Sequence, residues 1–503
     1  MATIPDYILP IGGLTLAPIL IGTVLLGVGY FLYTVIYNLF FHPLRKYPGP
    51  RLWAISSIPY AITFVSGNAH RKVRELHEKY GETVRLGPDH LAFNGPQAWK
   101  EIMGHKKAGE QEIGKVPGFF QGGPELSVIQ IEREGHAWQR RLLAHAFSAQ
   151  ALQAQEDLIK HYVDLLIQGI REKGDEGRIA QNAVRWFNYI TFDIIGDLAF
   201  GESFGALEKG TNHPWVEMIF DLFKYGAFNW MFLRLPVPRS LGIKFIPKSL
   251  QEKLATTNAL VEANLGKRMS LDLQRPDFVY YMTRKHREGF LSDKEVDSNA
   301  RLFVVAGSET TATTLSGTTF FLGKNPDIKE KLLNEVRTAF ESEDQININN
   351  AQSLRYLNAV LEETLRLFPA VPCGVPRMTP PEGATAFGEY IPGKTVMEIW
   401  HWPMFRNPKY FTQAEQFAPE RWLGDPRYKG DRLDMVQAFS YGPRNCLGKN
   451  LAWAEMRLIL ARLVWNFDFE LAKDSYDWMD KIQVYTIYDK PELNVHYVPR
   501  KFE

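Results

Sequence analysis

Cys446 lies in a segment whose residue types suit a flat ligand bound through sulfur. The segment reads Phe439-Ser440-Tyr441-Gly442-Pro443-Arg444-Asn445-Cys446-Leu447-Gly448, and a helical pattern over 447–467 follows it. A thiol at the start of a helix faces unpaired N–H groups and the positive end of the helix dipole, and both favour the thiolate. The two glycines permit a tight loop and a close approach of backbone to ligand, while Arg444 supplies a cation for a carboxylate. A lone cysteine is more often structural, so the hypothesis depends on the complete pattern.

Glu363 and Arg366 form a second candidate pair. They are three residues apart in a helical pattern over 356–368 and therefore share a helix face. Exposed to solvent, such a pair would stabilise the helix by only roughly a few tenths of a kcal/mol. The apolar neighbours Leu361 and Leu365 favour burial instead, and a buried ion pair requires further polar partners. The pair therefore predicts a structural network inside the protein.

Glu309 and Thr310 form a third candidate pair, inside the otherwise apolar part of a helical pattern over 293–322. Gly307 precedes them, and a glycine in a helix interior costs about 1 kcal/mol relative to alanine. A threonine in mid-helix often bonds the carbonyl four residues before it. We expect a local distortion that holds water, with an acid and an alcohol that pass protons to a bound reactant. The alternative is a kink whose polar groups satisfy one another.

Together these motifs resemble those of the cytochrome P-450 family of haem-thiolate monooxygenases. The family signature Phe-x-x-Gly-x-Arg-x-Cys-x-Gly is matched at all five fixed positions, by Phe439, Gly442, Arg444, Cys446 and Gly448. The other similar motifs are the Glu-x-x-Arg helix at 363–366, the Phe-Ala-Pro-Glu-Arg-Trp segment at 417–422 and the oxygen-activation motif at 306–311. Segments 41–60 and 140–148 are similar to those of membrane-bound fungal members of the isotrichodermin C-15 hydroxylase type.

The resemblance implies a role for each matching residue. Cys446 is the implied axial ligand of the iron in haem b. The implied haem-binding residues are His136, Arg140, Arg377, Phe439, Arg444, Cys446 and Gly448. Glu309 and Thr310 are the implied catalytic pair that supplies protons. Arg421 is the implied partner of Glu363 and Arg366 in a structural network.

Two of these assignments have alternatives. His136 and Arg140 are four residues apart, so on a helix they point at the same object, which the resemblance makes a haem propionate. The family usually has tryptophan at the first of these positions, and a slip of register would replace His136 by Trp138. Arg377 is similar to another propionate-binding arginine, and the alternative is a solvated surface arginine.

The implied reaction inserts one oxygen atom from dioxygen into a lipophilic molecule, such as a terpenoid or polyketide of fungal secondary metabolism. The 57 residues after Cys446 carry no flavin or nicotinamide motif. The implied electron source is therefore an NADPH-dependent cytochrome P-450 reductase, with cytochrome b5 as a second donor. Two rival functions are a haem-binding carrier or sensor without turnover, and a haem-thiolate isomerase or dehydratase that needs no reductase.

The composition excludes several other classes of protein. The chain of 503 residues has 58 basic and 57 acidic residues, so a nucleic-acid partner is not expected. Two cysteines, Cys373 and Cys446, are too few for a disulfide framework or a four-cysteine metal site. The glycine-rich fragments contain neither the dinucleotide fingerprint nor a phosphate-binding loop.

The amino terminus is apolar enough to cross a membrane. From Tyr7 to Leu44 there is no Asp, Glu, Lys or Arg over 38 positions, and about 20 apolar residues suffice to span a bilayer. A cleavable signal peptide would have a shorter apolar run. The basic residues Arg45, Lys46 and Arg51 follow this run, which predicts that the bulk of the chain faces the cytosol. We expect a single-pass protein of the endoplasmic reticulum membrane, with the anchor in residues 1–44.

The remainder, 45–503, is expected to form one catalytic domain that is mainly α-helical with a small β-sheet region. Candidate strands are 82–86 and 395–399, bounded by glycine and proline. Strands and helices do not alternate regularly, so a doubly wound parallel sheet is disfavoured. Candidate helices are 134–149, 151–173, 293–322, 327–341, 356–368 and 447–467. The resemblance implies a substrate pocket drawn from 116–129, 302–306, 370–376 and 485–488, and these segments are mostly apolar, as a lipophilic substrate requires.

Overall fold

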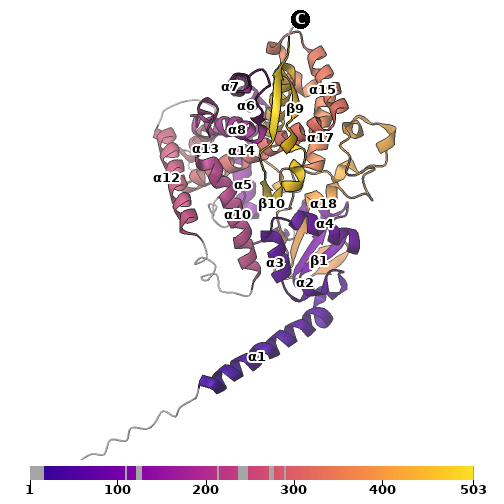
Figure 1. The fold of residues 1–503 in the computed structure, drawn as a ribbon. Helices are drawn as coiled ribbons and strands as arrows, with labels where there is room; N and C mark the ends of the chain where they lie inside the picture. The colour runs from indigo at the N-terminus through magenta and orange to yellow at the C-terminus, as the bar shows by residue number, and fades with distance from the viewer. Residues whose placement is uncertain are drawn as a thin grey trace, which may run out of the picture.

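The computed structural model describes residues 16–107, 110–119, 127–211, 214–235, 247–270, 277–287 and 291–501. This part of the chain is mainly helical with small sheets, as the sequence predicted (Figure 1). Residues 1–15 of the expected anchor and 120–126 of the expected pocket loop lie outside the described residues.

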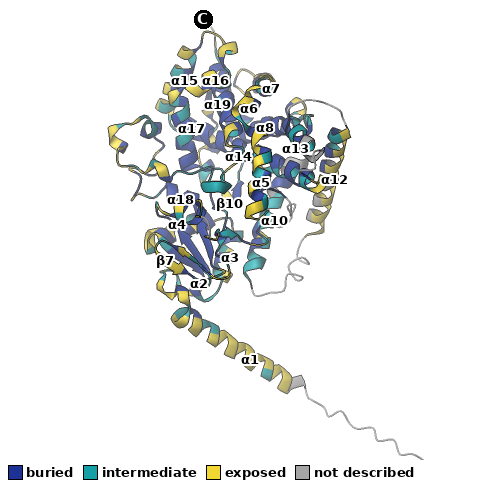
Figure 2. Cartoon of the chain, turned by 180° about the vertical axis from the view of Figure 1, so that it is seen from behind, coloured by how far each residue is buried: buried dark blue, intermediate teal, exposed yellow. Residues whose placement is uncertain are grey.

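Helix α1 (Leu16–Ile36) projects away from the rest of the protein (Figure 1). Its side chains are exposed along most of its length, as Figure 2 shows. The apolar stretch Pro18–Phe41 has a mean hydropathy of 2.2, and within it only Asn38, near its end, is buried in the protein. An apolar helix of this length that packs against nothing has the properties of a membrane span.

The helical part is built around α14 (Asp293–Lys324), which packs along α8 (Ala183–Phe200). A capping box starts α14, because the Ser292 hydroxyl accepts from the Glu295 N–H while the Glu295 carboxylate accepts from the Ser292 N–H. A Cβ on Gly307 would lie 2.7 Å from Cδ1 of Ile195 on α8. Close packing of the two helices therefore explains this glycine, and α14 continues through it as an unbroken α-helix rather than showing the expected distortion.

The remaining helices surround α14 and α8, or cover the sheet. Their bounds are α2 Arg51–Ile55, α3 Ile58–Val65, α4 Ala69–Tyr80, α5 Arg133–Leu143, α6 Ala149–Gln153, α7 Glu156–Gly174, α9 Ala206–Lys209, α10 Pro214–Arg234, α12 Lys248–Ser270, α13 Phe278–Arg287, α15 Pro326–Ala339, α16 Ile348–Ser353, α17 Arg355–Leu367, α18 His401–Phe405 and α19 Lys449–Asn466. The expected helix over 134–149 is observed as α5 followed by a 3-10 turn over Ala144–Phe147, because Ser148 caps a new helix, α6, by accepting from the Ala151 N–H.

A five-stranded sheet lies beside α2, α3 and α4, at the end of the protein from which α1 emerges (Figure 1). Its order is β1-β2-β8-β5-β3, and β2 pairs parallel with β8 while the other neighbours are antiparallel. Its strands are β1 Thr83–Gly87, β2 His90–Phe93, β3 Gly114–Lys115, β5 Arg377–Met378 and β8 Val396–Ile399. The smaller sheets contain β4 Gln181–Asn182, β6 Ala384–Ala386, β7 Glu389–Ile391, β9 Phe467–Leu471, β10 Gln483–Tyr485, β11 Ile487–Asp489 and β12 Asn494–Pro499.

Candidate active site

A cavity of about 320 Å³ lies between α14 and the segment that contains Cys446. Ala306, Gly307 and Thr310 line it from α14, while Phe439 and Cys446 line it from the loop before α19. Most of the other side chains in its wall are apolar, and they come from several parts of the chain: Phe147, Ile195, Leu302, Val371 and Val375. A pocket of this kind suits a lipophilic ligand.

The loop places the Cys446 thiol in the cavity wall. Gly442 has a φ of +77°, and a Cβ there would overlap the Met103 carbonyl oxygen, so only glycine fits. The Cys446 N–H donates to the Phe439 carbonyl over 2.9 Å and closes the loop. Helix α19 begins at Lys449, only three residues after the cysteine.

The thiol lies deep in the protein but is exposed to the cavity, which accounts for its surface exposure. Burial raises the pKa of the Cys446 thiol, while the Gly448 N–H, Arg140 and Lys449 act in the opposite direction. At Gly448 the nearest atom to an added Cβ would be 3.9 Å away, on Phe147. A Cβ at Gly448 would therefore make an ordinary van der Waals contact, in contrast to the crowded Gly442.

His136 and Arg140 lie on α5, and both line the cavity. Arg140 donates to the backbone carbonyl of Asn445 over 2.6 Å and to its side-chain oxygen over 2.5 Å, so it holds the loop beside Cys446. Burial and the nearby cations Arg444, Lys115 and Arg140 lower the pKa of His136 to about 4. His136 is therefore neutral at pH 7.

Arg377 reaches the same cavity from β5. Arg444 reaches it from the segment 439–448 around Cys446, which we call the cysteine loop. Arg444 donates to Glu112 over 2.6 Å and to the Ile131 carbonyl over 3.0 Å. Arg377 lies 3.5 Å from the same Glu112 carboxylate and is buried, with a pKa lowered by that burial to about 10. The surface position considered for Arg377 is thus not observed.

Thr310 and Glu309 point in different directions from α14. The Thr310 hydroxyl donates to the Ala306 carbonyl over 2.8 Å, and its side chain lines the cavity. Glu309 is 3 % exposed and is not part of the cavity wall. Its carboxylate contacts the Lys490 ammonium and accepts from the Thr313 hydroxyl over 3.0 Å. Of the two, only the threonine borders the cavity.

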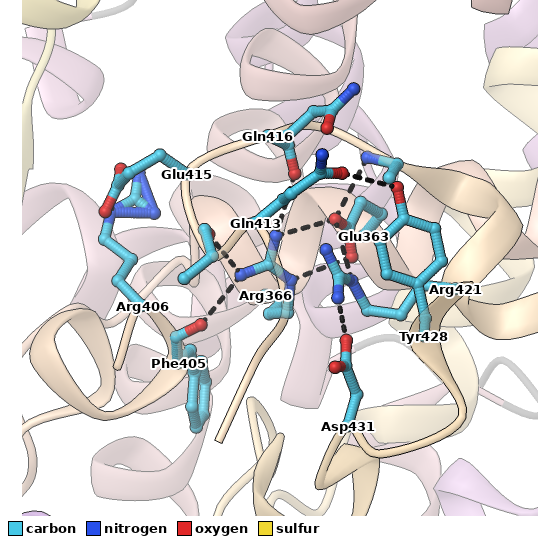
Figure 3. A network of polar contacts seen from close by, with 12 residues as sticks. Glu363, Arg366, Phe405, Arg406, Gln413, Glu415, Gln416, Arg421, Tyr428 and Asp431 are labelled. Atoms are coloured by element: carbon cyan, nitrogen blue, oxygen red, sulfur yellow. Dashed lines mark hydrogen bonds and ion pairs between the residues drawn. The ribbon is translucent and has the colours of Figure 1, made fainter. Parts of the chain in front are cut away.

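Glu363, Arg366 and Arg421 meet in one buried network, shown in Figure 3. Two parallel hydrogen bonds of 2.7 and 2.9 Å join Arg366 to Glu363 on α17. Arg421 donates to Glu363 over 3.3 Å and contacts Asp431, while its guanidinium stacks 4.3 Å from the centre of the Tyr428 ring.

Arg366 also donates to three backbone carbonyls, those of Phe405, Ala414 and Gln416, over 2.7 to 3.1 Å. The network thereby connects α17 with the chain between α18 and the cysteine loop. Since nearly all of its donors and acceptors are used by neighbours within the protein, its geometry is that of a structural support.

A family model described as cytochrome P-450 matches residues 47–495. That range contains the cavity, the cysteine loop and the buried network. This chain is a cytochrome P-450.

Relatives of this cytochrome P-450 occur among fungal proteins. A trichothecene C-15 hydroxylase of Fusarium sporotrichioides is 44 % identical over 94 % of this chain and 97 % of that protein. The monooxygenase astA of Talaromyces wortmannii is 42 % identical over 96 % of this chain and 97 % of its own length. The monooxygenase astJ of Aspergillus oryzae is 40 % identical over 93 % of this chain and 95 % of its own length.

The cavity of this cytochrome P-450 fits the haem that the family implies. One thiol reaches it, and Gly448, which has no side chain, lines the wall near that thiol. Three arginines and Lys115 are grouped in the wall beside neutral His136, a donor set suited to the carboxylates of a flat ligand. The rest of the wall is largely apolar, as a porphyrin ring requires.

Sequence reasoning missed four polar residues of this region: Glu112, Lys115, Glu455 and Lys490. Glu112 and Lys115 lie in a segment without a recognisable motif, and only the folded chain brings them to Arg444. Lys490 belongs to the carboxyl-terminal segment and meets Glu309 through tertiary packing. The sequence does contain a pattern that could have revealed Glu455. It is the one acid on the otherwise apolar face formed by 451, 452, 455 and 456 of α19.

Proposed function

We propose that this chain is a haem-thiolate monooxygenase that inserts one atom of dioxygen into a terpenoid or polyketide of fungal secondary metabolism. The observation that carries the proposal is the Cys446 thiol in the wall of an apolar cavity that Thr310 also lines. Haem held there supplies dioxygen activation and oxygen insertion, driven by two electrons and two protons.

The protein's own residues bind, orient and protect the reactants. Cys446 would provide the thiolate ligand, with Phe439 and Gly448 beside it. Arg140, Arg377 and Arg444 would neutralise the propionates, and His136, neutral at pH 7, would donate or accept a hydrogen bond there. The buried network of Glu363, Arg366 and Arg421 would keep the cysteine loop in place.

On α14, the Thr310 hydroxyl would hold a proton at the cavity wall. Glu309 would exchange protons with its neighbours Lys490 and Thr313, behind that wall. The apolar part of the wall, including Leu302, Val371 and Val375, would exclude water and orient a lipophilic substrate.

The printed activity of one relative, hydroxylation of a trichothecene at C-15, supports an oxygen insertion into a polycyclic terpenoid. Electrons would come from an NADPH-dependent cytochrome P-450 reductase, with cytochrome b5 as a second donor. Among the residues that the structure describes, one helix is long and apolar enough to cross a membrane, and it supports residues 1–44 as the anchor and 45–503 as the catalytic domain. The basic residues after α1 support an endoplasmic reticulum protein whose domain faces the cytosol.

The test is metabolite profiling of a host that expresses the full chain with a reductase, supplied with isotopically labelled dioxygen. A new product that contains one labelled oxygen and requires both NADPH and dioxygen is the expected result. Product formation without NADPH and dioxygen would indicate an isomerase or dehydratase. Bound haem without any product across terpenoid and polyketide hosts would indicate a carrier or sensor.

A further inference from the structure

Glu112 is the acid that contacts the basic side chains of the cavity. Its carboxylate accepts from the Arg444 Nε atom over 2.6 Å, and a guanidinium nitrogen of Arg377 lies 3.5 Å from the same carboxylate oxygen. The Glu112 side chain is 17 % exposed, so water screens these contacts only in part. Among the contacts that Arg140, Arg377 and Arg444 make with the described residues, Glu112 supplies the only carboxylate.

The backbone around Glu112 is fixed by the core and by the five-stranded sheet. Ile113, the next residue, is completely buried. Strand β3 follows it and pairs with β5, which places Lys115 opposite Arg377. Glu112 is therefore held close to the strand that carries one of its two arginines.

Glu112 lies behind the two arginines when they are viewed from the cavity. Arg377 and Arg444 line the cavity, whereas Glu112 is not part of its wall. Arg444 has a further partner in the Ile131 carbonyl, at 3.0 Å. Arg377 has one in the Met103 sulfur, which lies 3.1 Å from its Nε atom. A guanidinium group has more N–H donors than these contacts use, so the arginines keep donors for a ligand in the cavity.

Glu112 also reduces the positive charge at this end of the cavity. Arg140, Arg377 and Arg444 are charged at pH 7. Burial and the neighbouring arginines lower the pKa of Lys115 to about 6, so this lysine adds little charge at pH 7. With one negative charge against the charges of three arginines, the group matches the two carboxylates that haem b carries.

We propose that Glu112 is a positioning residue for haem, which holds Arg377 and Arg444 toward the propionates and lowers the reduction potential of the iron by its negative charge. The inference rests on the haem binding of the proposed function and adds to it a residue outside the cavity wall. A negative charge opposes the arrival of the electron that reduces the iron, and the low dielectric of a protein interior strengthens this effect. Loss of the charge should therefore make the iron easier to reduce, whereas loss of the hydrogen bonds should loosen the haem.

Replacement by glutamine separates the charge from the hydrogen bonding. Glu112→Gln keeps a side-chain oxygen that can accept from Arg444, but it removes the negative charge. In a spectroelectrochemical titration of the purified full-length haem protein, we expect a more positive midpoint potential in Glu112→Gln than in the wild type. Glu112→Asp keeps the charge and should stay close to the wild type. An unchanged potential in Glu112→Gln overturns the proposal.

Glu343 provides a matched control. Its carboxylate accepts from the Nε atom of Arg462 over 2.7 Å, so it also pairs with a mostly buried arginine, but neither residue lines the cavity. Glu343→Gln should leave the potential at the wild-type value. Equal shifts in Glu343→Gln and Glu112→Gln would show that the position of the lost charge does not matter, and this result would also overturn the proposal.

Transfer of haem to an excess of apomyoglobin measures the positioning. Glu112→Ala removes the hydrogen bonds together with the charge, so haem should leave this variant about tenfold faster than the wild type. Glu112→Gln should lose haem at a rate close to that of the wild type, because it keeps an acceptor for Arg444. A wild-type rate of haem loss in Glu112→Ala overturns the positioning role.

A second background applies if Glu112→Gln does not fold with haem. Arg377→Gln removes one cation from the group, and the double variant with Glu112→Gln removes the carboxylate as well. The double variant should have a more positive potential than Arg377→Gln alone, and equal potentials overturn the proposal. A failure of the proposed function is distinct from these results. A haem protein without turnover would form no product from NADPH and dioxygen but would still show the shifts in potential.

Discussion

The Glu309 carboxylate on α14 contacts the Lys490 ammonium from the segment after β11, and Lys490 also donates to Thr313 over 2.7 Å. The two charged side chains are almost completely buried. Burial acts to lower the pKa of Lys490 from its usual value, and the carboxylate in contact with the amine favours the charged form. Two elements separated by 181 residues are thus joined by an ion pair behind the cavity wall.

Removal of one partner should therefore destabilise the protein strongly. Lys490→Met leaves the Glu309 carboxylate buried without a cation, and we expect the free energy of unfolding to fall by about 3–5 kcal/mol. The double variant Lys490→Met with Glu309→Gln should recover most of this loss, because no charge is then left unpaired. Urea denaturation followed by tryptophan fluorescence measures all four members of the cycle. Additive effects of the two substitutions would contradict a direct pair.

The two cysteines should differ in their effect on the haem spectrum. Cys446→Ala removes the only thiol in the cavity wall, so the reduced protein should lose the red-shifted Soret band with carbon monoxide. Cys373→Ala should keep that band, because Cys373 is buried elsewhere and donates to the Thr486 carbonyl over 3.1 Å. Persistence of the thiolate band in Cys446→Ala would exclude it as the ligand.

Thr310→Ala should uncouple electron use from product formation. The substitution removes a hydroxyl from the cavity wall but leaves Cys446 and the basic side chains of that wall unchanged. The haem content should therefore stay near that of the wild type. Product formed per NADPH should fall by about tenfold as reduced oxygen leaves as peroxide. The comparison is made at equal haem concentration, with Thr310→Ser as the control that keeps the hydroxyl. Equal ratios in Thr310→Ala and wild type would mean that the hydroxyl is structural.

Membrane attachment should depend on α1. Deletion of residues 1–44 removes the whole exposed apolar stretch, and we expect the shortened chain to appear in the supernatant after a carbonate wash. The full-length chain should remain in the pellet under the same conditions. Release of the full-length chain by carbonate would contradict the assignment of α1 as an anchor.

The burial of His77 should make the free energy of unfolding depend on pH at acidic pH values. Burial lowers its pKa to about 4 from the ordinary 6.5, although its Nδ1 lies 2.9 Å from the Gly81 carbonyl. Between these two values the unfolded chain binds a proton that the native protein does not, so the free energy of unfolding decreases as the pH falls. The loss over the whole window amounts to about 3 kcal/mol.

His77→Gln should remove this contribution, so the variant should lose less stability than the wild type between pH 6.5 and about 4. Denaturation curves at several pH values in this window measure the difference. Parallel pH profiles of the variant and the wild type would show that His77 does not titrate as proposed.

The helices around the site could be predicted closely because their signals are local. Apolar periodicity and good helix-forming residues placed α14 within two residues of its observed end, and α15 and α17 were predicted equally well. Gly307 was interpreted wrongly, because the sequence cannot show that Ile195 packs against it.

The features of the candidate site also divide into those that the sequence predicted and those that it did not. The amino-acid sequence by itself determined the loop around Cys446 and the long apolar helix, because each is encoded in adjacent residues whose chemistry depends on their order: a cysteine between two glycines and an arginine, and a long run without charge. It also indicated that Glu363 and Arg366 are buried, since their neighbours on the helix are apolar.

Only the tertiary structure decided which acid lines the cavity. Glu309 and Thr310 are adjacent in the sequence, but successive residues of a helix point about 100° apart, so one lines the cavity and the other meets Lys490. Glu455 enters the same cavity from a helix that lies more than a hundred residues further along the chain. The relative position of α14 and α19 depends on the packing of the whole core, and no local pattern of residues contains that information.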